Sequence, residues 1–268
     1  MKESISKAVS CVVIMLLLTL GSVGAQEPAQ TNPEVEEKAM SVLKRMADFL
    51  SKAQRFSLTQ EISYDAVQES GQKIEFGSAR MVTIIRPNRV RMDITDRDGS
   101  KSGFIFDGKQ IAVFDTDPNV YATVSKPGTL DEAVDYFTQE LDMVMPLGEL
   151  FSSDLPNRLS DVVDSIYYVD ESIIDGVNCD HLAARTAKTD FEIWIAKGEK
   201  PLPHRVVINY KNEVGQPQFR AQLSDWNLSP KISDSYFAFT PLAGAKKIPF
   251  APWKSASAVG EKTEGGEK

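Results

Sequence analysis

The stretch FIFDGKQIAVFDTDPNVY, residues 104–121, decides the fold of this 268-residue chain. It contains two short runs of apolar residues, joined by Asp107-Gly108 and followed by Asp117-Pro118-Asn119, and both of these are turn sequences. The turns leave no room for a crossover helix, so neighbouring strands must run antiparallel. The pattern predicts strands over residues 103–106, 110–114 and 120–124.

The same pattern extends toward the N-terminus. Between Phe56 and Ala66 the residues alternate between apolar and polar, with Gln60 as the one polar break on the apolar side. This period of two is typical of a strand with one buried face. Two further strands are expected over residues 73–86 and 89–94, which completes a six-strand antiparallel meander.

Three helical segments interrupt or precede the strands. Asn32-Pro33 predicts a helix start, and a stripe of apolar residues at spacings of three and four follows it for about six turns. The motif Thr129-Leu-Asp-Glu132 is a capping box, which predicts a helix over residues 129–145 that Pro146 ends. A weaker helical piece over residues 147–163 is expected to be broken by Pro156.

Strands then resume in the second half of the chain, and they are expected over residues 166–169, 177–184, 190–196, 205–211, 218–226 and 236–239. Some strands are apolar on both faces: Phe104 and Phe106 point opposite to Ile105. Such strands must be covered on both sides. We therefore predict a mostly β, α+β fold: an unclosed antiparallel half-barrel whose concave apolar face is covered by helices.

The N-terminus has the pattern of a secretory signal peptide. Lys2 and Lys7 precede an uncharged apolar run over residues 8–20, and Val23-Gly24-Ala25 supplies the small residues of a cleavage site. We expect cleavage near Ala25, a periplasmic location, a single domain over residues 26–250 and a disordered tail over residues 251–268.

Composition argues against some partners. The net charge of −8 disfavours nucleic-acid binding as the function, because phosphate binding requires a basic face. Cys179 is the only cysteine after the signal, so no internal disulfide is expected. We expect a monomer.

Motifs for bond chemistry are absent from the sequence. Cys179 and His181 lie two residues apart on a predicted strand, but they have no third ligand or base nearby. No phosphate-binding loop, nucleophile elbow or zinc-protease motif is present. We therefore expect no enzyme activity, no metal and no cofactor.

Arg80 is the odd member of its strand face. It shares its parity with Phe76, Val82 and Ile84, so an unbroken strand points this cation inward, where it needs an acidic or carbonyl partner. A bulge at Gly77 would instead turn Arg80 to solvent. Both alternatives stay open, as do a dry core and a ligand cavity beneath the helices.

Several motifs resemble the periplasmic lipoprotein-carrier superfamily of LolA- and LolB-like proteins. They are the stretch over residues 104–121, then IDGVNCDHL (174–182), DFEIWI (190–195), PLPHRVVI (201–208) and FAFTPLAGAKK (237–247). Within the superfamily the chain is similar to a branch of predicted periplasmic proteins described as domain of unknown function 2092. The resemblance implies an open half-barrel that holds acyl chains between sheet and helices, and an arginine on the concave face that pairs with the helical lid.

The expected function is that of a soluble periplasmic binding or carrier protein for an acyl-bearing ligand, a lipid or lipoprotein, with transient contacts to envelope membrane proteins. The alternative is a protein-interaction or regulatory sensor module that uses the same concave face. The residues expected to line the hydrophobic site and its lid are Leu58, Ile62, Phe76, Arg80, Val82, Ile84, Met92, Phe137, Leu141 and Met145.

Overall fold

The computed structural model describes residues 33–141, 143 and 145–250. The chain divides into two units, residues 1–31 and 32–268, and the described residues all belong to the second. The predicted signal peptide and C-terminal tail lie outside the described residues. No helix in the described part is long and apolar enough to cross a membrane.

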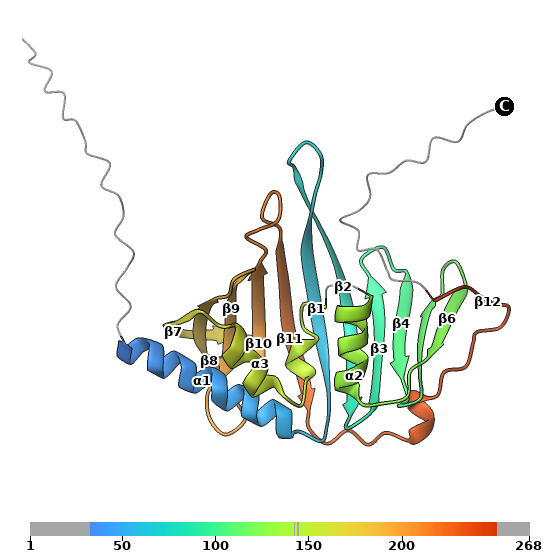
Figure 1. The fold of residues 1–268 in the computed structure, drawn as a ribbon, viewed down its shortest axis with the longest axis horizontal. Coiled ribbons are helices and arrows are strands. Elements are labelled where there is room, and N and C mark those ends of the chain that lie inside the picture. Colours follow the sequence, from blue (N-terminus) through green and yellow to red (C-terminus); the bar gives the residue numbers. More distant parts are fainter. Residues whose placement is uncertain (1–32, 142, 144, 251–268) are drawn as a thin grey trace, which may run out of the picture. The chain divides into compact units, whose positions relative to one another are not determined.

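Twelve strands form one sheet, and its order is β12-β6-β5-β4-β3-β2-β1-β11-β10-β9-β8-β7 (Figure 1). In chain order the strands are β1 (Arg55–Val67), β2 (Lys73–Ile85), β3 (Arg89–Asp96), β4 (Lys101–Phe106), β5 (Gln110–Asp115), β6 (Val120–Ser125), β7 (Ser165–Ile174), β8 (Val177–Arg185), β9 (Asp190–Ala196), β10 (Pro203–Asn209), β11 (Gln218–Asn227) and β12 (Lys246–Lys247).

All neighbouring strands pair antiparallel except β12 and β6. The six-strand meander is therefore confirmed as β1 to β6, and the second meander joins it through the β1–β11 pair. The edge strands β7 and β12 do not pair with each other, so the sheet is unclosed as predicted. Asp107-Gly108 makes one of the turns, where Gly108 adopts a φ of 85° that a side chain would strain.

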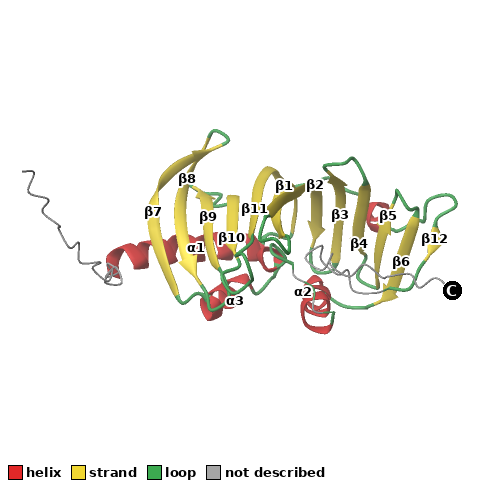
Figure 2. Ribbon diagram, turned by 90° about the horizontal axis from the view of Figure 1, so that it is seen from above, coloured by secondary structure: helices red, strands yellow, loops and turns green. Residues whose placement is uncertain are grey.

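Helices cover one face of the sheet, which we call the inner face (Figure 2). The helix α1 (Pro33–Lys52) lies across the second meander and contacts β7, β9 and α3 (Leu155–Val162). Its buried side chains Leu43, Met46 and Leu50 belong to the same hydrophobic core as inner-face residues of the strands. The amphipathic stripe of the sequence thus packs on the sheet, as the pattern requires.

The segment before β12 covers part of the opposite, outer face. Phe237 is fully buried, and Phe239 stacks on Phe114 with ring centroids 5.9 Å apart. This cover explains why Ile105, which points away from Phe104 and Phe106, is also buried. The prediction of a strand over residues 236–239 is wrong, because a 3-10 helix, η3 (Asp234–Phe237), places these aromatic rings on the sheet instead.

The helical region between β6 and β7 differs from its prediction in two ways. We call its first part, the described residues from 130 to 145, the central helical segment. The α-helix α2 (Leu130–Asp135) begins with the expected capping box but ends early, and a π-helical turn η1 (Tyr136–Glu140) follows it, so the helix does not reach Met145. Pro156 lies in the first turn of α3, which begins at Leu155, rather than breaking a helix, because proline fits that turn. The 3-10 helix η2 (Glu149–Phe151) connects the two segments.

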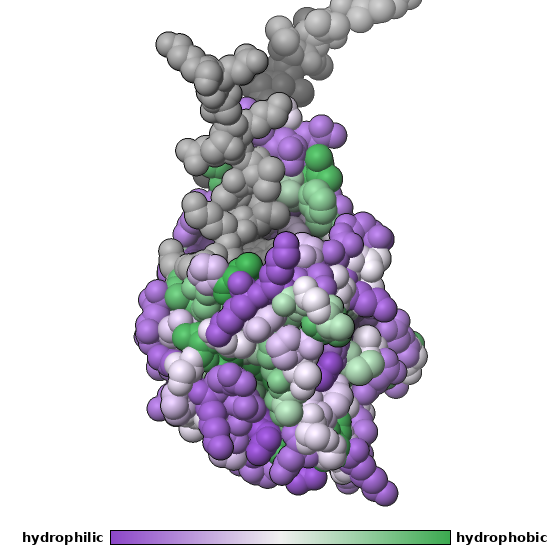
Figure 3. Space-filling view, turned by 90° about the vertical axis from the view of Figure 1, so that its right-hand side faces the viewer, coloured by the Kyte–Doolittle hydropathy of each residue, from purple (hydrophilic) through white to green (hydrophobic). Residues whose placement is uncertain are grey.

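Side chains at the β12 end of the sheet are mainly hydrophilic. Figure 3 shows this side, where apolar side chains form separate patches among polar ones. The exposed apolar residues that matter for the site lie elsewhere, on β2.

Candidate ligand-binding site

The register of the central strands arranges inner-face side chains in rows across the sheet. On β1 and β2 these are the even-numbered residues, and no register shift separates the two strands from Arg55–Ile85 to Val67–Lys73. The predicted alternative of a bulge at Gly77 is therefore wrong, and Arg80 shares its face with Val82 and Ile84. A row here is a set of cross-strand partners on the inner face that runs from β11 or β1 through β2 to β3.

The deepest rows are packed core, and we call them the deep rows. Their members on β1, β2 and β3 are Phe56, Leu58, Val82, Ile84, Val90 and Met92. All are fully or almost fully buried except Met92, which is half-buried and packs against them. Six expected site residues therefore come together in one hydrophobic core: Leu58, Ile62, Val82, Ile84, Met92 and Phe137.

Phe137 joins the central helical segment to the deep rows. Its side chain is 4% exposed, and its ring packs edge-on against Phe104 of β4 with centroids 5.3 Å apart. The ring of Phe250 lies 6.3 Å away. Leu141 and Met145 are half-buried and pack against the same core. The segment touches the sheet directly at Phe137.

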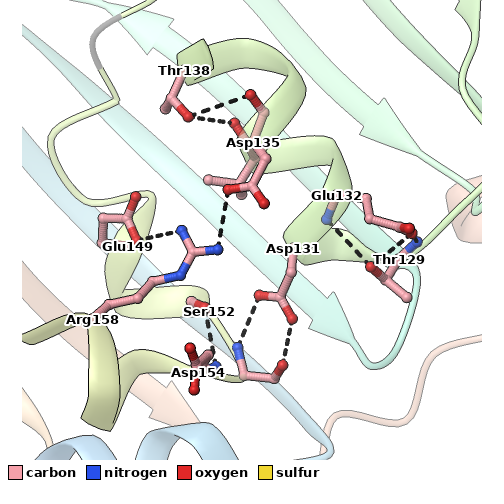
Figure 4. A network of polar contacts seen from close by, with 11 residues as sticks. Thr129, Asp131, Glu132, Asp135, Thr138, Glu149, Ser152, Asp154 and Arg158 are labelled. Carbon is pink, nitrogen blue, oxygen red and sulfur yellow. Dashed lines mark hydrogen bonds and ion pairs between the residues drawn. The ribbon is translucent and has the colours of Figure 1, made fainter. Parts of the chain in front are cut away.

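Polar contacts fix α2 against η2 and α3 (Figure 4). Arg158 of α3 donates to Asp135 at 3.1 Å and to Glu149 at 2.9 Å. Asp131 accepts a backbone hydrogen bond from Ser153 at 2.9 Å and a second one from its hydroxyl. Burial raises the pKa of Asp131, but these hydrogen bonds outweigh it and leave that pKa below its usual range. These contacts hold α2, η2 and α3 together.

Beyond Ile62 the inner face stays apolar but becomes exposed. Tyr64 stacks on its cross-strand partner Phe76 with ring centroids 6.0 Å apart, and Ile74 follows on the same face. Phe76 is 46% exposed and Ile74 is 39% exposed. We call Tyr64, Phe76 and Ile74 the open strip. Phe76 was expected in a covered cavity; it is exposed because the β1–β2 hairpin extends past the helices (Figure 1).

A polar row separates the deep rows from the open strip. Across β11, β1, β2, β3 and β4 this polar row consists of Leu223, Gln60, Arg80, Ile94 and Ser102. Gln60 is 1% exposed, and its Nε2 has no hydrogen-bond partner in the described part of the chain. Arg80 is half-buried and donates from Nε to Ser78 Oγ at 3.2 Å. Burial lowers the pKa of Arg80, and Asp96 and Tyr64 only partly oppose this shift.

Arg86, in the turn after β2, has carbonyl partners of a kind that Arg80 lacks in the described part of the chain. Arg86 donates to the carbonyl oxygens of Ala53, at 3.0 Å, and of Leu50, at 3.5 Å, at the C-terminal end of α1. Burial lowers its pKa, and the charge of Asp131 acts in the opposite direction. Arg86 thus links the turn after β2 to the C-terminal end of α1. Its parity with Val82 and Ile84 was visible in the sequence, but the carbonyl partners were not.

We expect Arg86→Met to lower the free energy of unfolding by about 1–3 kcal/mol, because it removes charge-assisted hydrogen bonds to a helix C-terminus. Urea unfolding followed by circular dichroism measures this loss. Arg80→Met is the matched control: it replaces a partly buried arginine within β2 but removes a single hydrogen bond to Ser78, so it should cost less. Equal losses in both variants would contradict the assignment.

Cys179 and His181 do point to the same face of β8, but their surroundings differ from those of a reactive pair. Cys179 is fully buried, and burial raises the pKa of its thiol to about 11. His181 stacks on Trp194, and its Nε2 lies 2.9 Å from Glu192 Oε2. No group of three potential ligands in the described residues is placed to hold a metal ion. These contacts support packing roles for both residues.

Known proteins were compared with the chain at the level of sequence and of structure. No curated protein matches. Similar solved structures include an uncharacterized conserved protein from Thermus thermophilus, with 11% identity, a TM-score of 0.47, and coverage of 80% of this chain and 99% of that one. Another is the lipoprotein LppX from Mycobacterium tuberculosis, with 14% identity, a TM-score of 0.47, and coverage of 76% and 100%. The LolA superfamily protein NE2245 from Nitrosomonas europaea has 13% identity, a TM-score of 0.39, and coverage of 75% and 97%.

Most of the chain also matches a family model. The model of a family described as "Predicted periplasmic protein (DUF2092)" matches residues 39–251, which include all strands of the sheet and most of α1. The resemblance to this branch is therefore confirmed, and the chain belongs to the DUF2092 family of predicted periplasmic proteins.

Proposed function

We propose that this protein binds an acyl-bearing ligand, a lipid or the acyl part of a lipoprotein, on the inner face of its sheet, and that it does so in the periplasm. The family description supports the location. The open strip supports the ligand class, because it is an apolar surface on the inner face and Phe76 and Ile74 within it are exposed. The site requires no metal, cofactor or bond chemistry.

One observation carries this proposal. Beyond Ile62 the inner-face residues Tyr64, Phe76 and Ile74 are apolar, and on β2 Phe76 and Ile74 are exposed. Exposed apolar surface of this kind marks a place where a partner or ligand removes water from it, at roughly 25 cal/mol per Å². An acyl chain fits a strip one strand pair wide, since it is narrow, flexible and wholly apolar.

The deep rows mark the inner end of the proposed site. Leu58, Val82, Ile84 and Met92 pack beneath the helices, and Phe137, Leu141 and Met145 belong to the segment that covers them. In the proposed complex the acyl chain lies along the open strip, and the inner end of the ligand reaches the polar row that borders this packed core. Ile62, Phe76 and Arg80 are then the expected residues that the ligand contacts.

A fluorescent hexadecyl probe, added to the purified protein and followed by anisotropy, tests the proposal. Phe76→Ser should weaken binding about tenfold or more, because a half-exposed aromatic side chain contributes over 1 kcal/mol of apolar contact. Met81→Ser is the matched control: Met81 is 55% exposed on the same strand but points to the opposite face. Its binding should stay unchanged.

Native mass spectrometry of the protein purified from the cell envelope supplies an independent result. A co-purifying lipid mass that Phe76→Ser reduces would agree with the proposal. No binding of the probe and no bound lipid would reject it. A protein bound to the open strip in place of lipid would favour the alternative, an interaction or sensor module.

A further inference from the structure

The polar row contains hydrogen-bond donors that lack acceptors among the residues that the structure describes. Gln60 is the one fully buried polar side chain of this row, and its unpartnered Nε2 carries two N–H groups. A buried amide of this kind destabilises the fold unless something binds it. Burial of an unpaired amide in an otherwise apolar face therefore points to a ligand that supplies the missing contact.

Arg80 lies directly opposite Gln60 on the neighbouring strand. Side chains at such positions have Cβ atoms about 4.5–5.5 Å apart, so one small group can contact both. Apart from its Nε bond to Ser78, no hydrogen bond or ion pair of Arg80 is present among the described residues. Guanidinium groups donate and cannot accept, so the missing group must be an acceptor.

The positive charge of Arg80 favours an anionic acceptor over a neutral one. Arg80 is a partly buried cation, and Asp96 influences it without forming an ion pair. An anionic oxygen would compensate this charge and accept from the guanidinium by two N–H groups. A neutral hydroxyl would satisfy one hydrogen bond and leave the charge uncompensated.

We infer that Gln60, Ser78 and Arg80 form a head-group subsite for an anionic oxygen group, a carboxylate or a phosphate, at the end of the ligand's alkyl chain. This inference rests on the proposed function. The head group lies at the polar row, and the chain runs outward past Ile62 along Tyr64, Phe76 and Ile74. Gln60 and Ala66 are six residues apart on β1, about 20 Å, which matches an extended long acyl chain.

Competition against the hexadecyl probe at neutral pH tests the subsite with three ligands of equal chain length: hexadecanoic acid, hexadecyl phosphate and hexadecanol. The wild-type protein should bind one or both anions at least tenfold more tightly than the alcohol. The preferred anion distinguishes a free fatty acid from a phosphate-bearing lipid. Ionic-strength series exclude a non-specific charge effect.

Two variants assign the preference to the polar row. Arg80→Met and Gln60→Leu should reduce the preference for the anion to less than about threefold, because they should weaken binding of the anion much more than binding of hexadecanol, whose hydroxyl loses at most one hydrogen bond. Arg205→Met is the control, because Arg205 lies on the outer face beside Trp194. Gln60→Leu should keep or raise the melting temperature, since it removes an unpaired buried amide, whereas a structural glutamine would lower it.

The outcomes separate the two proposals. Equal binding of anions and alcohol by the wild-type protein, or an unchanged preference in folded Gln60→Leu, overturns the head-group subsite while the acyl site stands. If the hexadecyl probe does not bind the wild-type protein at all, the acyl site itself is rejected.

Discussion

Phe137→Ala should lower the free energy of unfolding by about 3–5 kcal/mol, the usual cost of removing a buried phenylalanine side chain. Phe137 is 4% exposed and meets the ring of Phe104 directly, so its removal leaves a cavity between the central helical segment and the sheet. Because Arg158 and Ser153 hold this segment in place, it cannot easily collapse into that cavity. Urea unfolding followed by circular dichroism measures the loss.

Two comparisons make this result specific. Gln139→Ala, an exposed position in the same π-helical turn, should change stability by less than about 0.5 kcal/mol. A double-mutant cycle with Phe104→Ala should show a coupling of about 0.5–1.5 kcal/mol for the edge-on ring pair.

Whether lipid changes the stability loss of Phe137→Ala shows where the ligand lies. In the proposed complex the ligand lies on the open strip, so delipidation should not alter the effect of Phe137→Ala. A loss of about 1–3 kcal/mol that added lipid reverses would instead place the ligand beneath the central helical segment, as the sequence alone also allowed.

Much of the fold followed from local patterns. Turns such as Asp107-Gly108, too short for a helix, required an antiparallel meander, and the alternation around Gln60 gave the inner face of β1 correctly. The capping box placed the start of α2. These features depend on neighbours in the chain, so one sequence is enough to recognise them.

What the sequence did not predict depends on contacts between distant segments. The aromatic residues near Phe239 alternate like a strand, but they pack as a 3-10 helix and loop against Phe114 and Tyr121, more than a hundred residues earlier. The π-helical turn after Asp135 likewise lets Phe137 reach Phe104. In both cases tertiary packing outweighs the local pattern.

The candidate site was predictable in part for the same reason. Parity alone placed Arg80 on the inner face, and the unbroken register of β1 and β2 confirms it. Parity could not show that the helices stop short of Phe76, because the cover of a strand comes from residues far along the chain. Nor could it show that Arg86 binds carbonyls at the end of a helix, whereas the side chain of Arg80 donates to Ser78 alone among the described residues.

Phe56→Ala should cost about 3–5 kcal/mol of stability, because this ring lies at the junction of the two meanders. Phe56 is fully buried on β1, and the rings of Phe151 and Trp226 lie 5.9 Å and 5.8 Å from it. One side chain thus contacts η2 and β11 together. Thermal and urea unfolding of the variant measure the loss, and near-ultraviolet circular dichroism should show that the environment of Trp226 changes.

Phe76→Ala is the informative counterpart, since it truncates the same residue type on the paired strand. With 46% of Phe76 already exposed, its removal should cost less than about 1 kcal/mol of stability, although it should weaken binding of the hexadecyl probe. Phe56→Ala should lower stability strongly, and any folded fraction should still bind the probe. The two variants therefore separate a phenylalanine that holds the sheet and helices together from one that is left uncovered. Equal losses of stability would mean that the open strip is part of the core, and the proposed acyl site would then have no exposed surface to offer.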